Sequence, residues 1–230
     1  MCAGPISTHG TGRFPWSDTD RNTLKEELVA DVNLYLDPVC PFSWVTWRWL
    51  HDAALTTHRS VDLRQMNLAV LNEGNDLNGQ QQRMMERSRR LGRLFAAVTD
   101  RHGPDAFVSL YEAVGTRIHV LQEEMTRGRI EDILADNGFD GSLAEALDDS
   151  GFDESVKRAH DASQSAFGGR GGSPIIVVDG NAYFGPVLTR VPGPEEGVAL
   201  LNAVLTVATS PGFAVLQRPH GPPTIGEAGH

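Results

Sequence analysis

Apolar positions recur along the chain with two different periods, which predicts strands and helices in alternation. From Asp31 to Leu36 and from Val61 to Leu68, polar and apolar residues alternate as in a strand with one buried face. Between these strands a helical pattern begins at Pro41 and runs to about His58. A strand, a helix and a strand of these lengths predict one right-handed βαβ unit with parallel strands.

The middle of the chain has a helical period almost throughout, and the end returns to strands. The expected helical segments are Gln80–Arg101, Asp105–Val120, Met125–Asn137, Ser142–Asp148 and Asp153–Phe167, with Asp153 as a helix N-cap. Pro174 to Val178 and Asn181 to Phe184 read as two strands joined by an Asp179-Gly180 hairpin turn. A last helix is expected over about Pro194 to Thr209.

This order of elements predicts an α/β fold whose core is interrupted by an all-helical insertion. The core is expected in residues 29–78 and 168–210, and the helical insert in residues 79–167. Residues 1–28 and 211–230 are rich in glycine and proline and are interpreted as a flexible arm and a tail without regular structure. In the tail, Phe213, Val215 and Leu216 are expected to dock on the body.

Composition and charge narrow the functional classes. The formal net charge is −10 and no basic stripe offsets it, which argues against nucleic-acid binding. We find no apolar run of membrane-spanning length and no secretory signal, so a cytoplasmic protein is expected. Two cysteines exclude a disulfide-stapled scaffold. The histidines lie on different predicted elements without cysteine partners, so no metal is expected.

A cysteine lies where the first strand gives way to the first helix. Cys40 opens the sequence Cys40-Pro41-Phe42-Ser43, after the Asp37-Pro38 turn. The free N–H groups and positive dipole end of a helix stabilise a thiolate, so this position predicts a reactive thiol of lowered pKa. Ser43 is one helical turn further on and is expected to donate a hydrogen bond to the sulfur. The alternative is that Cys40 is an ordinary buried residue.

A serine and a proline precede the third predicted strand. A proline that opens a strand removes a hydrogen-bond donor from the sheet, so the proline of Ser173-Pro174 is expected to have a specific role. In thioredoxin-like proteins such a proline is cis and faces the active-site cysteine. A trans proline at an edge or turn is the alternative. Cys-Pro-x-Ser after the first strand together with Ser-Pro before the third is a stronger signal than either motif alone.

These motifs resemble a known family. The stretches DPVCPFSWVTWRWL, MNLAVLNE, GTRIHV and GSPIIVVDGNAYFGPVL occur in the order seen in the actinobacterial DsbA-like thiol oxidoreductases, and are most similar to the mycothiol-dependent nitroreductase type. The likeness runs from about residue 30 to the tail. It implies a thioredoxin-like fold with an inserted all-helical domain, a nucleophile at Cys40, a cis-proline at Pro174 and mycothiol, or another low-molecular-weight thiol, as co-substrate.

One departure from that family changes the expected chemistry. The nitroreductase type carries Cys-Pro-x-Cys, whereas this chain has Ser43 in place of the second cysteine. A serine cannot close an internal disulfide, so an external thiol must resolve any mixed disulfide on Cys40. Cys2, in the N-terminal arm, is interpreted as an incidental thiol. Kappa-class glutathione transferases and hydroxychromene-carboxylate isomerases, which share the fold, use a serine-led motif to hold a small thiol.

Further residues are candidates for the substrate site. Pro41, Phe42 and Trp44 surround the motif, and Trp44 is expected to offer an aromatic face, although most of this surface should be core. His119 is a candidate for orienting a ligand, with a structural, hydrogen-bonded histidine as the alternative. Asn67 and Asn72 are expected either to line the same cleft or to cap a loop. Phe184-Gly185-Pro186 is expected to turn beside the site.

The expected activity is a cytoplasmic monothiol oxidoreductase that uses Cys40 and Ser43. It would reduce a mixed disulfide or a small electrophilic or nitroaromatic substrate. Two alternatives stay open: a thiol transferase or isomerase in which a bound thiol does the chemistry, and a non-catalytic relative that binds a thiol or a partner protein. The expected partners are a small-molecule thiol and a small-molecule substrate, and the chain is compatible with a homodimer.

Overall fold

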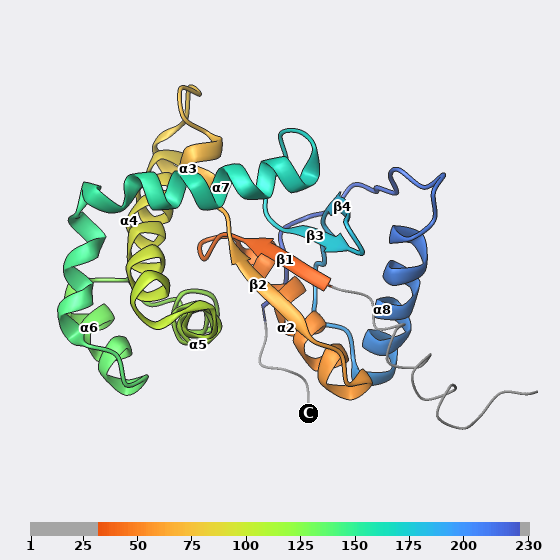
Figure 1. Cartoon of the computed structure of the whole chain (residues 1–230), viewed down its shortest axis with the longest axis horizontal. Helices are drawn as coiled ribbons and strands as arrows, with labels where there is room; N and C mark the ends of the chain where they lie inside the picture. The colour runs from red at the N-terminus through yellow and green to blue at the C-terminus, as the bar shows by residue number, and fades with distance from the viewer. Residues whose placement is uncertain (1–31, 226–230) are drawn as a thin grey trace, which may run out of the picture.

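A mixed four-stranded sheet forms the centre of the computed structural model, which describes residues 32–225 (Figure 1). Its strands are β1 (Val32–Leu36), β2 (Val61–Gln65), β3 (Ile175–Val178) and β4 (Asn181–Phe184), in the order β2-β1-β3-β4. β1 is parallel to β2 and antiparallel to β3, and β3 is antiparallel to β4. The predicted α/β class is confirmed. The expected arm 1–28, with Cys2, lies outside the described residues.

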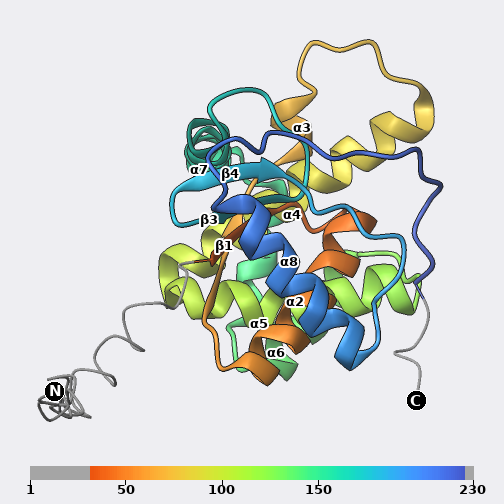
Figure 2. The same ribbon diagram turned by 90° about the vertical axis from the view of Figure 1, so that its right-hand side faces the viewer.

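Helices cover both faces of this sheet. The α-helices are α2 (Pro41–Thr57), α3 (Leu68–Leu71), α4 (Gly79–His102), α5 (Pro104–Gly115), α6 (Arg127–Asp136), α7 (Asp153–Phe167) and α8 (Pro194–Ala208). A π-helix, η1 (Thr116–Val120), continues α5, and two 3₁₀ segments, η2 (Gly141–Asp148) and η3 (Ser150–Phe152), precede α7. α2 and α8 pack together on one face, whereas α7 contacts β2, β3 and β4 from the other (Figure 2).

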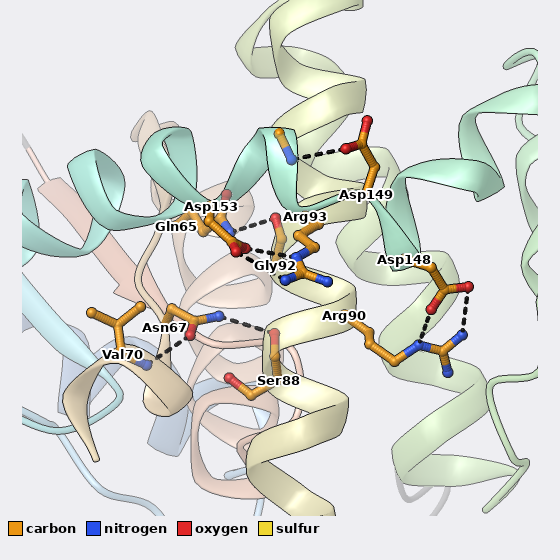
Figure 3. Close-up of polar contacts among 11 residues, drawn as sticks. Gln65, Asn67, Val70, Ser88, Arg90, Gly92, Arg93, Asp148, Asp149 and Asp153 are labelled. Atoms are coloured by element: carbon orange, nitrogen blue, oxygen red, sulfur yellow. Dashed lines mark hydrogen bonds and ion pairs between the residues drawn. The ribbon is translucent and has the colours of Figure 1, made fainter. Parts of the chain in front are cut away.

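The long helix α4 is fastened to the sheet by buried amide groups at the end of β2. Gln65 donates a hydrogen bond of 2.9 Å to the carbonyl of Gly92, and Asn67 donates one of 2.9 Å to the carbonyl of Ser88 (Figure 3). Arg93 on the same helix forms an ion pair with Asp153 at the start of α7, at 2.6 Å. These contacts hold the helices between β2 and β3 against the core.

Several expected boundaries are corrected by local capping. β2 ends at Gln65 rather than continuing to Leu68, because the Asn67 side chain accepts the N–H of Val70 and starts α3. α6 begins at Arg127, two residues later than expected, since Thr126 caps it. Asp153 does not act as an N-cap: it is the first residue of α7, and its carboxylate pairs with Arg93 instead.

The hairpin turn is as expected, whereas only one of the three tail residues expected to dock does so. Asp179 and Gly180 have φ values of 49° and 79°, as a tight turn between β3 and β4 requires. Phe213 docks on Tyr183, with ring centroids 5.9 Å apart. Val215 and Leu216 do not dock: their exposed fractions are 76% and 88%, because the segment after Phe213 runs over the surface.

A glycine at the end of α5 makes room for a buried tryptophan of α2. Trp44 is 3% exposed, and a Cβ added to Gly115 would lie 2.3 Å from its ring atom Cζ3. Any larger residue must displace that ring, which also contacts Tyr111 at a centroid distance of 5.9 Å. The lack of a side chain at Gly115 therefore allows the end of α5 to pack against the start of α2.

We predict that Gly115→Ala destabilises the fold by about 1–3 kcal/mol, because the added methyl group overpacks a closed contact. Urea-induced unfolding gives the free energy of unfolding. The matched control is Gly128→Ala in α6, where an added Cβ meets nothing within 4 Å and helix propensity favours alanine. Equal stability of the two variants would show that Trp44 adjusts without cost.

Candidate functional site

Cys40 caps the first helix from a tight turn at the end of β1. The Asp37 carboxylate accepts the N–H of Val39 at 2.8 Å, and the N–H of Cys40 donates to the Asp37 carbonyl at 3.1 Å. Pro41 then occupies the first helical turn, where its missing N–H costs nothing. The turn and the proline together fix the thiol at the N-terminal end of α2.

Ser173, in the loop that precedes β3, forms three hydrogen bonds with the residues around Cys40. The Ser173–Pro174 peptide bond is cis. The Cys40 thiol donates to the Ser173 carbonyl with a distance of 3.3 Å from Sγ to O, and the Asp37 N–H donates to Ser173 Oγ at 2.9 Å. The hydroxyl groups of Ser43 and Ser173 lie 2.6 Å apart. The structure thus brings Cys40, Ser43, Ser173 and Pro174 together.

Either hydroxyl of the serine pair can donate to the other. Ser173 Oγ accepts the N–H of Asp37 and keeps its own proton, so when Ser173 donates to Ser43 the proton of Ser43 is available to the sulfur. Ser43 lowers the pKa of Cys40 through its side chain and its backbone N–H. Ser43 therefore acts on the sulfur while it is itself held by Ser173.

The expected lowering of the thiol pKa is wrong for this structure. Burial, the largest effect, raises the pKa of Cys40 above its ordinary value, and the Asp37 charge raises it further. The hydrogen bonds from Ser43 and from the Phe42 N–H oppose this rise without cancelling it. Cys40 is 6% exposed, so the helix N-terminus acts on a thiol that water scarcely reaches.

Asp37 is a buried carboxylate that sequence reasoning treated only as part of a turn. Besides Val39, it accepts the N–H of Leu68 at 2.6 Å and the hydroxyl of Ser88 at 2.5 Å. Burial raises its pKa, while these three hydrogen bonds lower it. The signal available in the sequence was an aspartate before proline, whose side chain often accepts the N–H two residues on. Its link to Ser88 is not visible in the sequence.

His119 supports the cysteine loop from the π-helix η1. Its Nε2–H donates to the Pro38 carbonyl at 2.9 Å, and its ring stacks on Trp44 at a centroid distance of 5.7 Å. Burial lowers the pKa of His119 to about 4, so the imidazole is neutral near pH 7. Trp44 and His119 are both buried, which agrees with the structural role considered for each of them, and a role toward a ligand stays a prediction.

A second buried group lies beneath Trp44. Tyr111 is fully buried, and its hydroxyl has no hydrogen-bond partner among residues 32–225. Burial raises the pKa of Tyr111 well above its usual value, and the charges of Cys40 and Asp37 add to the rise. This phenol is therefore a buried, neutral group, and no sequence motif marks it.

Comparison with known proteins connects this arrangement to one family. Residues 39–218 match the family described as Rv2466c-like, mycothiol-dependent nitroreductase Rv2466c. The chain belongs to this family. An uncharacterized protein of Mycobacterium tuberculosis, Rv2286c, is 26% identical over 201 residues, which cover 86% of this chain and 85% of that protein.

Solved structures of low sequence identity share the fold. A probable DsbA oxidoreductase from Streptomyces coelicolor superposes with a TM-score of 0.53 at 16% identity, over 82% of this chain and 94% of that one. The cytosolic disulfide reductase DsbM from Pseudomonas aeruginosa gives a TM-score of 0.51 at 16% identity, over 77% and 99%. The family and these neighbours make the chain a DsbA-like, thiol-dependent oxidoreductase with a thioredoxin-type fold.

Other residues singled out from the sequence have structural roles. Asn67 is buried and caps α3, and Asn72 donates to the carbonyl of Leu68 at 2.9 Å, so both belong to the loop rather than to a cleft. The turn at Phe184-Gly185-Pro186 does lie beside α2, because the Pro186 carbonyl accepts the hydroxyl of Thr46 at 2.7 Å. Phe42 remains half-buried at the surface, where its ring meets His220.

Residues 32–225 contain neither a metal site nor a membrane-spanning helix. Within this range no group of three or more histidine, cysteine, aspartate or glutamate side chains is arranged to hold a metal ion. None of the helices in the same range is long and apolar enough to cross a membrane.

We predict that Asp37→Asn lowers the pKa of Cys40, because it removes a negative charge that raises that pKa. It should also cost about 1–3 kcal/mol of stability, since an amide cannot accept all three donors. The pH dependence of alkylation by iodoacetamide measures the pKa. Asp62→Asn, an exposed position on β2, is the matched control. An unchanged or higher pKa in Asp37→Asn contradicts the expectation.

We predict that His119 makes the fold less stable in mild acid. An unfolded histidine titrates near 6.5 and His119 titrates at about 4, so stability is lost as the pH falls through this interval. Between about pH 7 and about pH 5 the loss attributable to His119 is about 2 kcal/mol. Urea unfolding at both pH values should show this loss in wild type and in the exposed His102→Phe control. A loss of the same size in His119→Phe would rule out this histidine as its source.

Proposed function

We propose that Cys40 is the nucleophile of a monothiol cycle in which mycothiol is the reducing co-substrate. The observation that carries the proposal is the contact of Cys40 Sγ with the Ser173 carbonyl, beside the cis peptide bond to Pro174. In the proposed reaction an incoming disulfide pairs with this same stretch of backbone, where Ser173 is 7% exposed. Family membership supports a thiol as the partner.

The proposed exchange keeps atoms and electrons in balance. The Cys40 thiolate attacks one sulfur of a disulfide, a new bond forms between Cys40 and that sulfur, and the other sulfur leaves as a thiolate. A mycothiol thiolate then attacks the mixed disulfide, so that Cys40 is released and a mycothiol disulfide forms. In each cycle one mycothiol is consumed, one thiol leaves the substrate, and the disulfide bond passes from the substrate to mycothiol. Cys40 is the one free cysteine in residues 32–225, so an external thiol performs the second attack.

Ser173 and Ser43 interact with the sulfur of Cys40 in its thiol form and in its thiolate form, respectively. When Cys40 is a thiol, it donates to the Ser173 carbonyl. When it is a thiolate, it needs a donor, and Ser43 supplies one in the arrangement in which Ser173 donates to Ser43. The two hydroxyl groups thus oppose the desolvation that raises the pKa of Cys40. Pro41 and Phe42 form the surface next to the sulfur that a substrate meets first.

Nitroaromatic compounds are a second substrate class, favoured by the family description. Reduction of a nitro group to a nitroso group consumes two thiols and yields one disulfide and water. In this chain both thiols would come from mycothiol, or one from Cys40 and one from mycothiol. A cytoplasmic setting, where low-molecular-weight thiols are kept reduced, suits either substrate.

A thiol transferase or isomerase is the second candidate function, and three features of Cys40 and its motif favour it. Cys40 is 6% exposed with a raised pKa, and serine stands at the position of a second cysteine. In that case bound mycothiol supplies the reactive sulfur and Cys40 helps to place it. The two candidates differ in whether a covalent bond to Cys40 forms.

We predict that incubation of the full chain with oxidised mycothiol adds one mycothiol unit to Cys40. Intact-mass analysis measures the adduct, and peptide mapping locates it. Cys2→Ala is the matched control and should still form the adduct, whereas Cys40→Ala should form none. Absence of the adduct in a protein that still binds mycothiol would favour the transferase or isomerase. Absence of both would remove mycothiol as the partner.

A further inference from the structure

The C-terminal segment 211–225 folds back toward the cysteine instead of leaving the molecule. It is fixed at its start, where the Tyr183 hydroxyl donates to the Phe213 carbonyl at 3.1 Å. It is fixed again near its end, where the N–H of Thr224 donates to the carbonyl of Thr189 at 2.7 Å. Between these points the chain is exposed and runs along the edge of the molecule (Figure 2).

This segment reaches the active-site helix through one aromatic contact. The ring of His220 meets the ring of Phe42 edge to face, with centroids 5.0 Å apart. Phe42 is two residues after Cys40, in the first turn of α2. Residues 189 and 190 lie across from this segment and form the second wall of a groove, of which the segment is the first wall. They follow the turn that is held to α2 by the hydrogen bond from Thr46 to Pro186. The segment therefore adjoins the place where a substrate approaches the sulfur.

A groove of about 450 Å³ lies between these two walls, and its charge is positive. Arg190 and Arg218 line it together with His220 and two threonines, Thr189 and Thr224, and none of its lining residues is acidic. Arg190 is already paired with Glu196 at 2.9 Å. Arg218 forms no ion pair with any residue between 32 and 225. On a chain with a net charge of −10, a guanidinium that has no carboxylate partner among the described residues favours an anion.

We infer that this groove binds the carboxylate, or a similar planar anionic group, of the substrate that Cys40 acts on. A guanidinium binds a carboxylate through two parallel hydrogen bonds, which gives orientation as well as affinity. Arg218 is the anchoring group, and His220 holds the segment against Phe42. The inference rests on the proposed function for the identity of the substrate, but the anion site itself does not require a reactive cysteine.

Two nitroaromatic probes of one shape test the site. 4-Nitrobenzoate and 4-nitrobenzamide share their ring and nitro group and differ in the charge of the other substituent. NMR titration of the isotope-labelled full chain gives the dissociation constant of each probe and shows whether the backbone signals of Phe42 and His220 shift. We expect the anion to bind more tightly, with shifts at both residues, and added salt to weaken it.

The variants separate the groove from the overall charge of the protein. Arg218→Gln should weaken binding of 4-nitrobenzoate about tenfold and leave 4-nitrobenzamide unchanged. Arg101→Gln, an exposed arginine at the end of α4, removes the same charge elsewhere and should change neither. Equal affinity for the two probes, an unchanged constant in Arg218→Gln, or shifts confined to other regions overturns the inference.

The same titration on Cys40→Ala distinguishes this inference from the proposed function. Retained anion binding in Cys40→Ala, whatever the outcome with oxidised mycothiol, supports the groove as a site of its own. Anion binding that disappears in Cys40→Ala while that variant unfolds like wild type in urea would show that the groove does not bind the anion by itself, and would overturn the inference.

Discussion

One buried carboxylate holds the parts of the site in their places. Asp37 is fully buried, and its three donors come from three segments: Val39 in the cysteine turn, Leu68 at the start of α3, and Ser88 on α4. A buried carboxylate is costly unless hydrogen-bond donors satisfy its oxygens. Movement of any one of these segments would remove a donor from Asp37, so the carboxylate holds the three segments together. The turn that presents Cys40 is thus fixed to the helices that follow β2.

The same constraint has a chemical consequence for the thiol. Burial and the negative charge of Asp37 both disfavour the thiolate of Cys40, while the serine pair and the N-terminus of α2 favour it. Cys40 is 6% exposed, so a partner must reach a sulfur that its surroundings cover. In the proposed cycle, the fixed position of Cys40 therefore comes with a smaller fraction in the thiolate form.

Features encoded by neighbouring residues could be predicted from the sequence, and features that join distant ones could not. The alternation in β1, the Asp179-Gly180 turn and the helix after Cys40 are local patterns, and each occurs in the structure. The burial of Trp44 depends on Gly115, which is 71 positions away. His119 was considered as a ligand group because its partner, the Pro38 carbonyl, lies 81 positions away and carries no side-chain signal.

The proposed reactive centre and the proposed anion site are built from different parts of the chain. The buried carboxylate, the sulfur and Ser173 lie in the loops next to β1 and β3, and Ser43 lies in the first turn of α2, so backbone geometry determines their positions. The charged wall of the groove comes instead from an extended surface segment with few contacts, and the stretch matched by the family ends at residue 218. Because a surface segment tolerates change better than a buried hydrogen-bond network, the proposed anion site can vary among proteins that keep this cysteine turn.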